Sequence, residues 1–117
     1  MIGKVRNWFG LLPRHARHLR QKFTRGFSDA DLWNLNHTIA KFVWPRLEAF
    51  RKANPVYPGC EGMETKANWA AALDDMAFAL RMLAEEWDWE IKGTREDWER
   101  CHRGLRLFGE WFRALWW

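Results

Sequence analysis

The 117-residue sequence lacks any long apolar run, and none approaches the ~20 residues that a membrane-spanning helix needs. Its beginning shows no extended apolar stretch followed by a small-residue cleavage site, so we expect no secretion signal. No segment sustains the alternation of apolar and polar residues that is typical of a half-buried strand. These absences predict a cytosolic protein without β-sheet.

Cysteine is scarce as well. Cys60 and Cys101 are the two cysteines, and neither stands in a metal-ligand spacing, so we expect reduced thiols, with a single disulfide as the alternative. His15 and His18 lie far from Cys101 and His102 in the sequence, and no spacing supports a shared metal. We therefore expect no metal and no cofactor.

The sequence also lacks a convincing catalytic motif. Asp74-Asp75 and Glu85-Glu86 are adjacent carboxylates, but neighbouring residues on a helix point in different directions. The same objection applies to Cys101 and His102 as a nucleophile and base. We expect a binding protein, not an enzyme.

Helical periodicity fills most of the chain. The longest pattern covers residues 25–53, and two others cover residues 66–91 and 95–117. The clear loop is residues 54–65, which hold two prolines and two glycines. We predict an all-α fold, a small helical bundle of three long helices with a basic N-terminal helical segment. Residues 1–117 are expected to form one domain, with residues 1–25 as the basic segment and 28–117 as the helical body.

Start signals mark each long helix. Ser28 with Asp31 resembles a capping box, and Thr65 and Thr94 are further N-cap candidates. Pro13 is expected to interrupt the N-terminal helix and begin a second one, while Pro45 predicts a kink with helix on both sides, or two separate helices. We expect residues 25–53 to be central, because two apolar stripes run along this stretch: Leu32, Leu35, Ile39, Phe42, Val43, Leu47 and Phe50, and then Trp33, His37, Ala40 and Trp44.

Charge and tryptophan are both distributed unusually. Residues 1–25 contain seven basic and no acidic residues, whereas the remaining chain has a net charge of −3. Ten of the 117 residues are tryptophan, more than a helical core of this size needs. Guanidinium groups bind phosphates and indoles stack on bases. The pattern therefore predicts a site for an anionic, nucleotide-like ligand, made by Arg14, Arg17, Arg20, Arg25, Trp33, His37 and Trp44.

Three alternatives remain beside this site. The simplest is a solvated basic face over a tryptophan-rich core, and the net charge of −3 on the body makes long duplex nucleic acid a poor partner. Residues 1–12 have the pattern of a helix at a membrane surface, although docking of that helix onto the bundle is favoured. Trp116 and Trp117 at the chain end favour an exposed apolar patch and hence a homo-oligomer, or a protein-binding inhibitor or scaffold without a small ligand.

One resemblance suggests where the protein acts. The residues that carry it are Arg25–Asp29, Trp33–Leu35, His37–Phe42 and Pro45–Leu47, together with the closing Gly104-Leu105, Leu107-Phe108 and Phe112–Trp116. They are similar to a family of small proteins of unassigned function encoded by tailed bacteriophages and prophages. The resemblance covers about half of the chain. It implies a phage protein in the host cytoplasm, and with the Arg and Trp content it suggests an anti-defence role, the capture of an immune signalling nucleotide.

Overall fold

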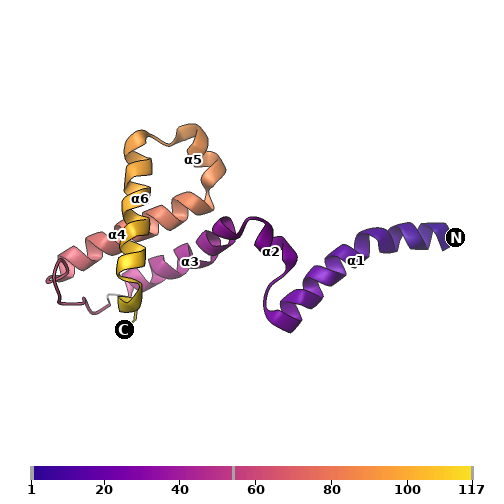
Figure 1. The fold of residues 1–117 in the computed structure, drawn as a ribbon, viewed down its shortest axis with the longest axis horizontal. Helices are drawn as coiled ribbons and strands as arrows, with labels where there is room; N and C mark the ends of the chain where they lie inside the picture. The colour runs from indigo at the N-terminus through magenta and orange to yellow at the C-terminus, as the bar shows by residue number, and fades with distance from the viewer. Residues whose placement is uncertain (1, 54, 117) are drawn as a thin grey trace. The chain divides into compact units, whose positions relative to one another are not determined.

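The computed structural model describes residues 2–53 and 55–116, and the side chains of residues 14–53, 55–86 and 88–116. The described residues form helices and loops and no strand, which confirms the predicted all-α class (Figure 1). The chain divides into two compact units, Met1–Leu35 and Asn36–Trp117. The predictions for the side chains of Trp117 and of residues 1–12 lie outside the described side chains.

The first unit contains α1 (Ile2–Arg25) and α2 (Asp29–Trp33). The expected interruption at Pro13 is wrong, because α1 continues through this residue as one helix. The predicted start at Ser28 is confirmed: its backbone N–H donates to Asp31 Oδ2 at 2.9 Å and completes the capping box. Gly26, at φ +82°, allows the chain to reverse between the two helices.

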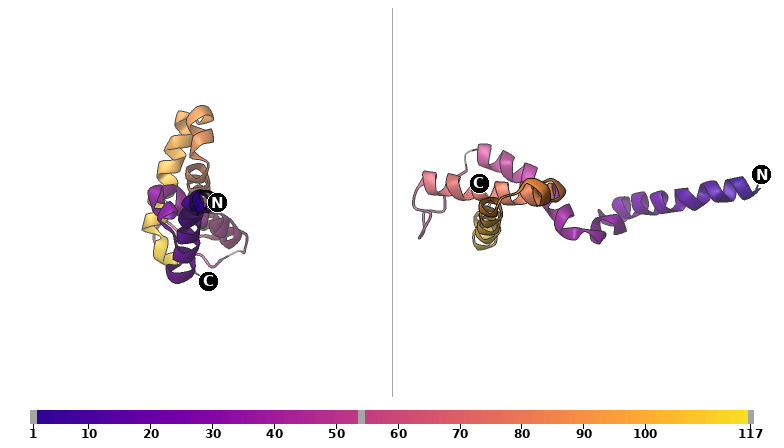
Figure 2. Two further views of the ribbon diagram at one scale, coloured as in Figure 1. Left: turned by 90° about the vertical axis from the view of Figure 1, so that its right-hand side faces the viewer. Right: turned by 90° about the horizontal axis from the view of Figure 1, so that it is seen from above.

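The second unit contains α3 (Leu35–Lys52, whose first residue belongs to the other unit), α4 (Lys66–Ala84), α5 (Glu86–Lys92), α6 (Arg95–Glu110) and the 3₁₀-helix η1 (Phe112–Ala114). Helix α6 packs across α4 (Figures 1 and 2). The N-caps at Thr65 and Thr94 are confirmed, since their side chains accept from the backbone N–H groups of Asn68 and Asp97.

All three of the predicted long helices are shorter than expected. The 25–53 stretch breaks at Asn34, which has φ −133° and ψ 65°, whereas α3 passes through Pro45 with helix on both sides as predicted. The 66–91 stretch is divided at Glu85 into α4 and α5. The last stretch ends as an α-helix at Glu110 and continues into η1.

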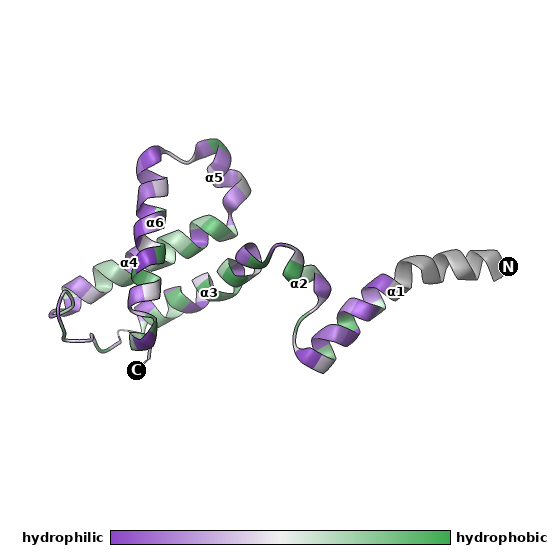
Figure 3. Ribbon diagram, in the orientation of Figure 1, coloured by the Kyte–Doolittle hydropathy of each residue, from purple (hydrophilic) through white to green (hydrophobic). Residues whose placement is uncertain are grey.

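The core is centred on α4, and our expectation of a central 25–53 helix is wrong. Trp69, Leu73 and Met76 are among its fully buried side chains, while Ile39 and Phe42 of α3 are 47% and 58% exposed. Figure 3 shows the hydrophobic colour spread along α4, whereas α6 is mostly hydrophilic. Small side chains are also among the buried residues of α4: Ala72, Ala77 and Ala79.

Candidate functional site

A large pocket of the second unit lies where α3, α4 and α6 meet. It is open, has a volume of about 640 Å³, and falls within the size range of small-molecule sites. We call it the three-helix pocket. Four basic residues, two acidic residues and two aromatic rings stand out in its lining, which is made by Trp44, Pro45, Glu48, Ala49, Arg51, Lys52, Asp74, Ala77, Phe78, Arg81 and Arg100.

Arg100 of α6 forms one wall of the three-helix pocket. Its Nη2 and Nε donate to Asp74 and Asp75 of α4, each at 2.9 Å, and its guanidinium lies 4.2 Å from the centre of the Phe78 ring. Arg103 adds a second cation to Asp75 at 3.2 Å. Both carboxylates hold Arg100 in place and offset its positive charge. This residue therefore shapes the pocket and attracts an anionic ligand only weakly.

Arg51 of α3 is held in a similar way. Its Nη2 donates to Glu48 at 3.0 Å, and Nη1 lies 3.9 Å from Asp74. The hydrogen bond to Glu48 raises the pKa of Arg51 above its ordinary value, against the effect of partial burial. Its Nε is buried and has no hydrogen-bond partner among the described residues, so this wall keeps one unused donor.

Trp44, Lys52 and Arg81 are the parts of the pocket best able to meet a ligand. The Arg81 guanidinium lies 5.5 Å from the centre of the Trp44 ring, and its Nε donates to Glu85 at 3.2 Å. Lys52 is exposed at the end of α3 and makes no polar contact within the described part of the chain. The indole of Trp44 and the cationic side chains of Lys52 and Arg81 therefore line the same open pocket.

Trp44 was predicted as a site residue, but the cations beside it were not. Trp44, Glu48 and Arg51 follow one another at spacings of four and three in α3, which is the spacing of residues on one helix face. The sequence alone could therefore have placed Glu48 and Arg51 on the same helix face as Trp44. Arg81 and Arg100 come from two other helices, and no sequence spacing links them to Trp44.

Three of the predicted residues meet in the first unit. Arg14, Arg17 and Trp33 line a smaller open pocket of about 260 Å³ between α1 and α2, together with His18, Asp29 and Ala30. The Trp33 side chain is 90% exposed, so its ring is free for stacking. This α1–α2 pocket thus contains the residue types that were predicted, on adjacent helices.

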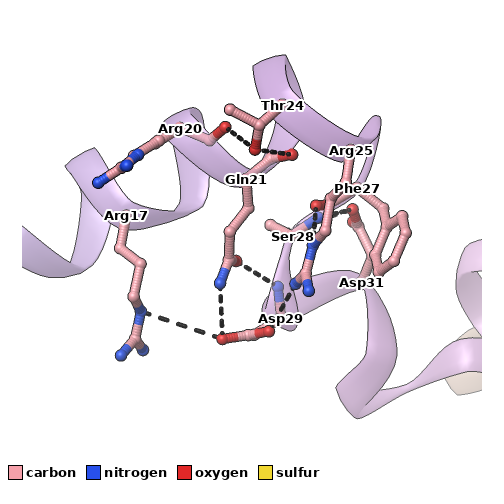
Figure 4. A network of polar contacts seen from close by, with 9 residues as sticks. All are labelled: Arg17, Arg20, Gln21, Thr24, Arg25, Phe27, Ser28, Asp29 and Asp31. Carbon is pink, nitrogen blue, oxygen red and sulfur yellow. Dashed lines mark hydrogen bonds and ion pairs between the residues drawn. The ribbon is translucent and has the colours of Figure 1, made fainter.

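An acidic residue limits the charge of the α1–α2 pocket. Figure 4 shows Asp29 accepting from Gln21 at 2.9 Å and from Arg25 at 2.7 Å, with Arg17 Nε at 4.0 Å. The hydrogen bond from Gln21, and then that from Arg25, lowers the pKa of Asp29 below its ordinary value. The carboxylate is therefore ionised at neutral pH, and its ion pair with Arg25 makes that guanidinium less available to a ligand.

The remaining predicted residues lie elsewhere. Arg20 lines neither of the two pockets, and only its backbone carbonyl takes part in the network of Figure 4, accepting from Thr24 at 2.8 Å. His37 is partly buried in α3 and also lines neither pocket. Trp44 belongs to the three-helix pocket. A single site built from all seven predicted residues stays a prediction.

No group of three potential metal-ligating side chains occurs among the residues that the structure describes. Cys60 is exposed and Cys101 is buried, and both are free thiols. Burial raises the pKa of Cys101, so this thiol is poorly reactive. None of the described helices combines the length and apolar character that crossing a bilayer demands.

Comparisons with known protein families, with characterised proteins and with solved structures find no match for this chain. The function must therefore be inferred from the pockets and surfaces themselves.

Proposed function

We propose that the protein binds a small anionic ligand that carries an aromatic ring, such as a nucleotide, in the three-helix pocket, without acting on it chemically. The observation that carries this proposal is the pairing of Trp44 with Arg81 beside Lys52 in an open pocket of about 640 Å³. The aromatic part of the ligand stacks on Trp44, and its phosphate groups bind Lys52 and Arg81. Arg51 and Arg100, fixed by carboxylates, form the rigid walls.

The setting that we propose follows from the resemblance to phage proteins. There, a protein that binds a signalling nucleotide without catalysis withdraws it from the host's immune pathway. This role requires no catalytic group, and it places the protein in the host cytoplasm. It depends on the nucleotide proposal and fails with it.

The test is thermal unfolding of the full chain against a panel of linear and cyclic nucleotides. A ligand that binds only the folded state adds about 2.7 kcal/mol at 100 times its dissociation constant. Lys52→Gln combined with Arg81→Gln removes two charge-assisted contacts, so we expect the affinity to fall by more than about tenfold. Lys41→Gln combined with Arg106→Gln removes two exposed cations outside this pocket and should retain binding.

A further variant locates the ligand. Arg17→Glu with Arg20→Glu changes the first unit alone, and we expect it to leave the affinity unchanged if the three-helix pocket is the site. Loss of binding in this variant, with normal binding in the Lys52 and Arg81 variant, would move the site to the α1–α2 pocket. If no nucleotide stabilises the protein, the proposed ligand class is wrong.

A second candidate function is binding of a protein partner or self-association. It is favoured by an open apolar groove of about 280 Å³ between α3, α6 and η1, lined by Phe42, Val43, Arg46, Leu47, Phe50, Phe108, Phe112 and Leu115. Phe42 and Phe112 are 58% and 62% exposed, and Trp116 beyond η1 is 70% exposed. Exposed aromatic side chains grouped in this way are typical of interfaces.

A further inference from the structure

One side of α1 is occupied by its contacts with α2. Gln21 and Arg25 hold Asp29 at the start of α2, and Arg14 and His18 line the pocket that α2 completes. These four α1 residues, spaced by three and four, lie on one face of the helix. The α2 segment therefore covers a polar, basic side of α1.

A different face of α1 is apolar and exposed. Ala16, Leu19 and Phe23 follow at spacings of three and four, and Phe23 is 89% exposed. Leu19 also lines an open pocket of about 350 Å³ with Ser28, Ala30 and Asp31, and it is still 58% exposed. Because a helix turns once in about 3.6 residues, Phe23 lies about 160° around the helix from Gln21, and it lines neither of the two pockets that α1 and α2 form together.

The apolar pattern extends along the whole helix. Counting back from Ala16, the same alternation of four and three residues reaches Leu12, Phe9, Val5 and Ile2. Because α1 is continuous through Pro13, these positions belong to one stripe of a single 24-residue helix and not to two short ones. In the described part of this stripe Ala16, Leu19 and Phe23 are exposed, and an exposed apolar face of an amphipathic helix marks an interaction site.

The charge on α1 indicates the partner. Residues 1–25 contain seven basic and no acidic side chains. Arg20 and Lys22 lie beside the stripe and are exposed. An apolar face flanked by cations matches a surface that offers hydrocarbon and negative charge together, which is the boundary region of an anionic lipid membrane.

A second copy of α1 fits the same face less well. The alternating spacing would suit a two-stranded coiled coil, in which the positions next to the seam carry complementary charges. Here those positions include Arg6, His15, Arg20 and Lys22, and none is acidic. Pairing two such helices in parallel brings like charges together, whereas a lipid surface neutralises them.

We propose that α1 is an interfacial helix that binds anionic lipid surfaces through Ala16, Leu19, Phe23 and the stripe that precedes them. The helix lies in the plane of the membrane, with its apolar face at the boundary of headgroups and acyl chains. Arg20 and Lys22 extend their apolar stems along the hydrocarbon and place their charges among the lipid phosphates. This surface is separate from both pockets that hold the candidate ligand residues.

The experiment is co-sedimentation of the full chain with vesicles of phosphatidylcholine alone and of phosphatidylcholine mixed with phosphatidylglycerol. We expect binding to the mixed vesicles that decreases with added salt. Phe23→Glu and Thr24→Glu form a matched pair, since both positions are exposed neighbours in the last turn of α1 and both changes add one negative charge. The added charge should lower the vesicle affinity of each variant about fivefold. Phe23→Glu should lower it about tenfold further, because this change also removes an apolar anchor.

Failure of the wild-type protein to sediment with the mixed vesicles would overturn the proposal. Equal binding by Phe23→Glu and Thr24→Glu would also overturn it, because the apolar face would then play no part. A third contrary result is a lipid-free dimer that Phe23→Glu dissociates, which would assign the stripe to a second copy. Circular dichroism of both variants verifies that α1 remains helical.

Discussion

At the scale of single residues, one glycine sets the distance between α4 and α6. A Cβ atom added at Gly104 would collide with the backbone carbonyl of Asp75 and lie 2.7 Å from the Cβ of Ala79. The close approach also lets Arg100 and Arg103, which precede Gly104 in α6, reach Asp75 at 2.9 and 3.2 Å. The absence of a side chain at one position thus supports the wall of the three-helix pocket.

Gly104→Ala should therefore destabilise the protein although alanine is the better helix former. We expect the free energy of unfolding to fall by about 1–3 kcal/mol, the usual cost of overpacking. Gly109→Ala is the matched control in the same helix, because nothing lies within 4 Å of its added Cβ, and it should be neutral or stabilising by up to about 1 kcal/mol. Chemical denaturation of both variants measures the difference. Equal stability of the two would show that the helices separate at little cost.

At the scale of elements, the capped helix starts were predictable and the breaks inside the predicted helical stretches were not. Ser28, Thr65 and Thr94 cap their helices through bonds within three residues, so the sequence contains the whole signal. The breaks at Asn34 and Glu85 carry no proline or glycine, and both depend on how neighbouring segments pack. We did not predict that α1 continues through Pro13, because we gave too much weight to the local rule that proline interrupts a helix.

The candidate site shows the same division. Trp44 was identified because indoles stack on bases and because it lies in an apolar stripe of residues 25–53, and a helical-spacing argument could have added Arg51. Arg81 and Arg100 could not be assigned, since their positions in the pocket depend on how α3, α4 and α6 cross. The exposed face of α3 was mistaken for core because apolar spacing is the same for a buried stripe and for a binding surface.

That exposed face of α3 provides a prediction for self-association. If the groove between α3, α6 and η1 binds a second copy, Phe42→Asp should abolish concentration-dependent association, because it places a charge in the apolar contact. Asn36→Asp adds the same charge at an exposed position of α3 outside the groove and should leave association intact. Light scattering over a range of protein concentrations measures both. A wild-type protein that stays monomeric at every concentration would leave the groove without this role.

At the scale of the whole molecule, burial is divided very unevenly between the two units. Among the side chains that the structure describes, all twelve buried hydrophobic residues lie in the second unit, from Ala40 to Cys101. Among the described side chains of the first unit, Ser28 is the one that is buried. Cooperative folding depends on a shared apolar core, so stability should reside in residues 36–117.

A fragment of residues 36–117 should therefore fold without the first unit. We expect it to retain helical circular dichroism and a single cooperative thermal transition, with a midpoint within a few degrees of that of the full chain. A peptide of residues 1–35 should melt gradually, as an isolated helix without a core does. A 36–117 fragment with no cooperative transition would contradict this division of stability.

The two cysteines give this chain a built-in pair of chemical reporters. Cys60 sits in the exposed loop before α4 and is open to maleimide dyes, whereas Cys101 is fully buried between α4 and α6. A dye added to the native protein thus marks one known position without mutagenesis. Modification of Cys101 then proceeds only when the α4–α6 contact opens. The rate at which Cys101 is modified therefore measures how often that contact opens.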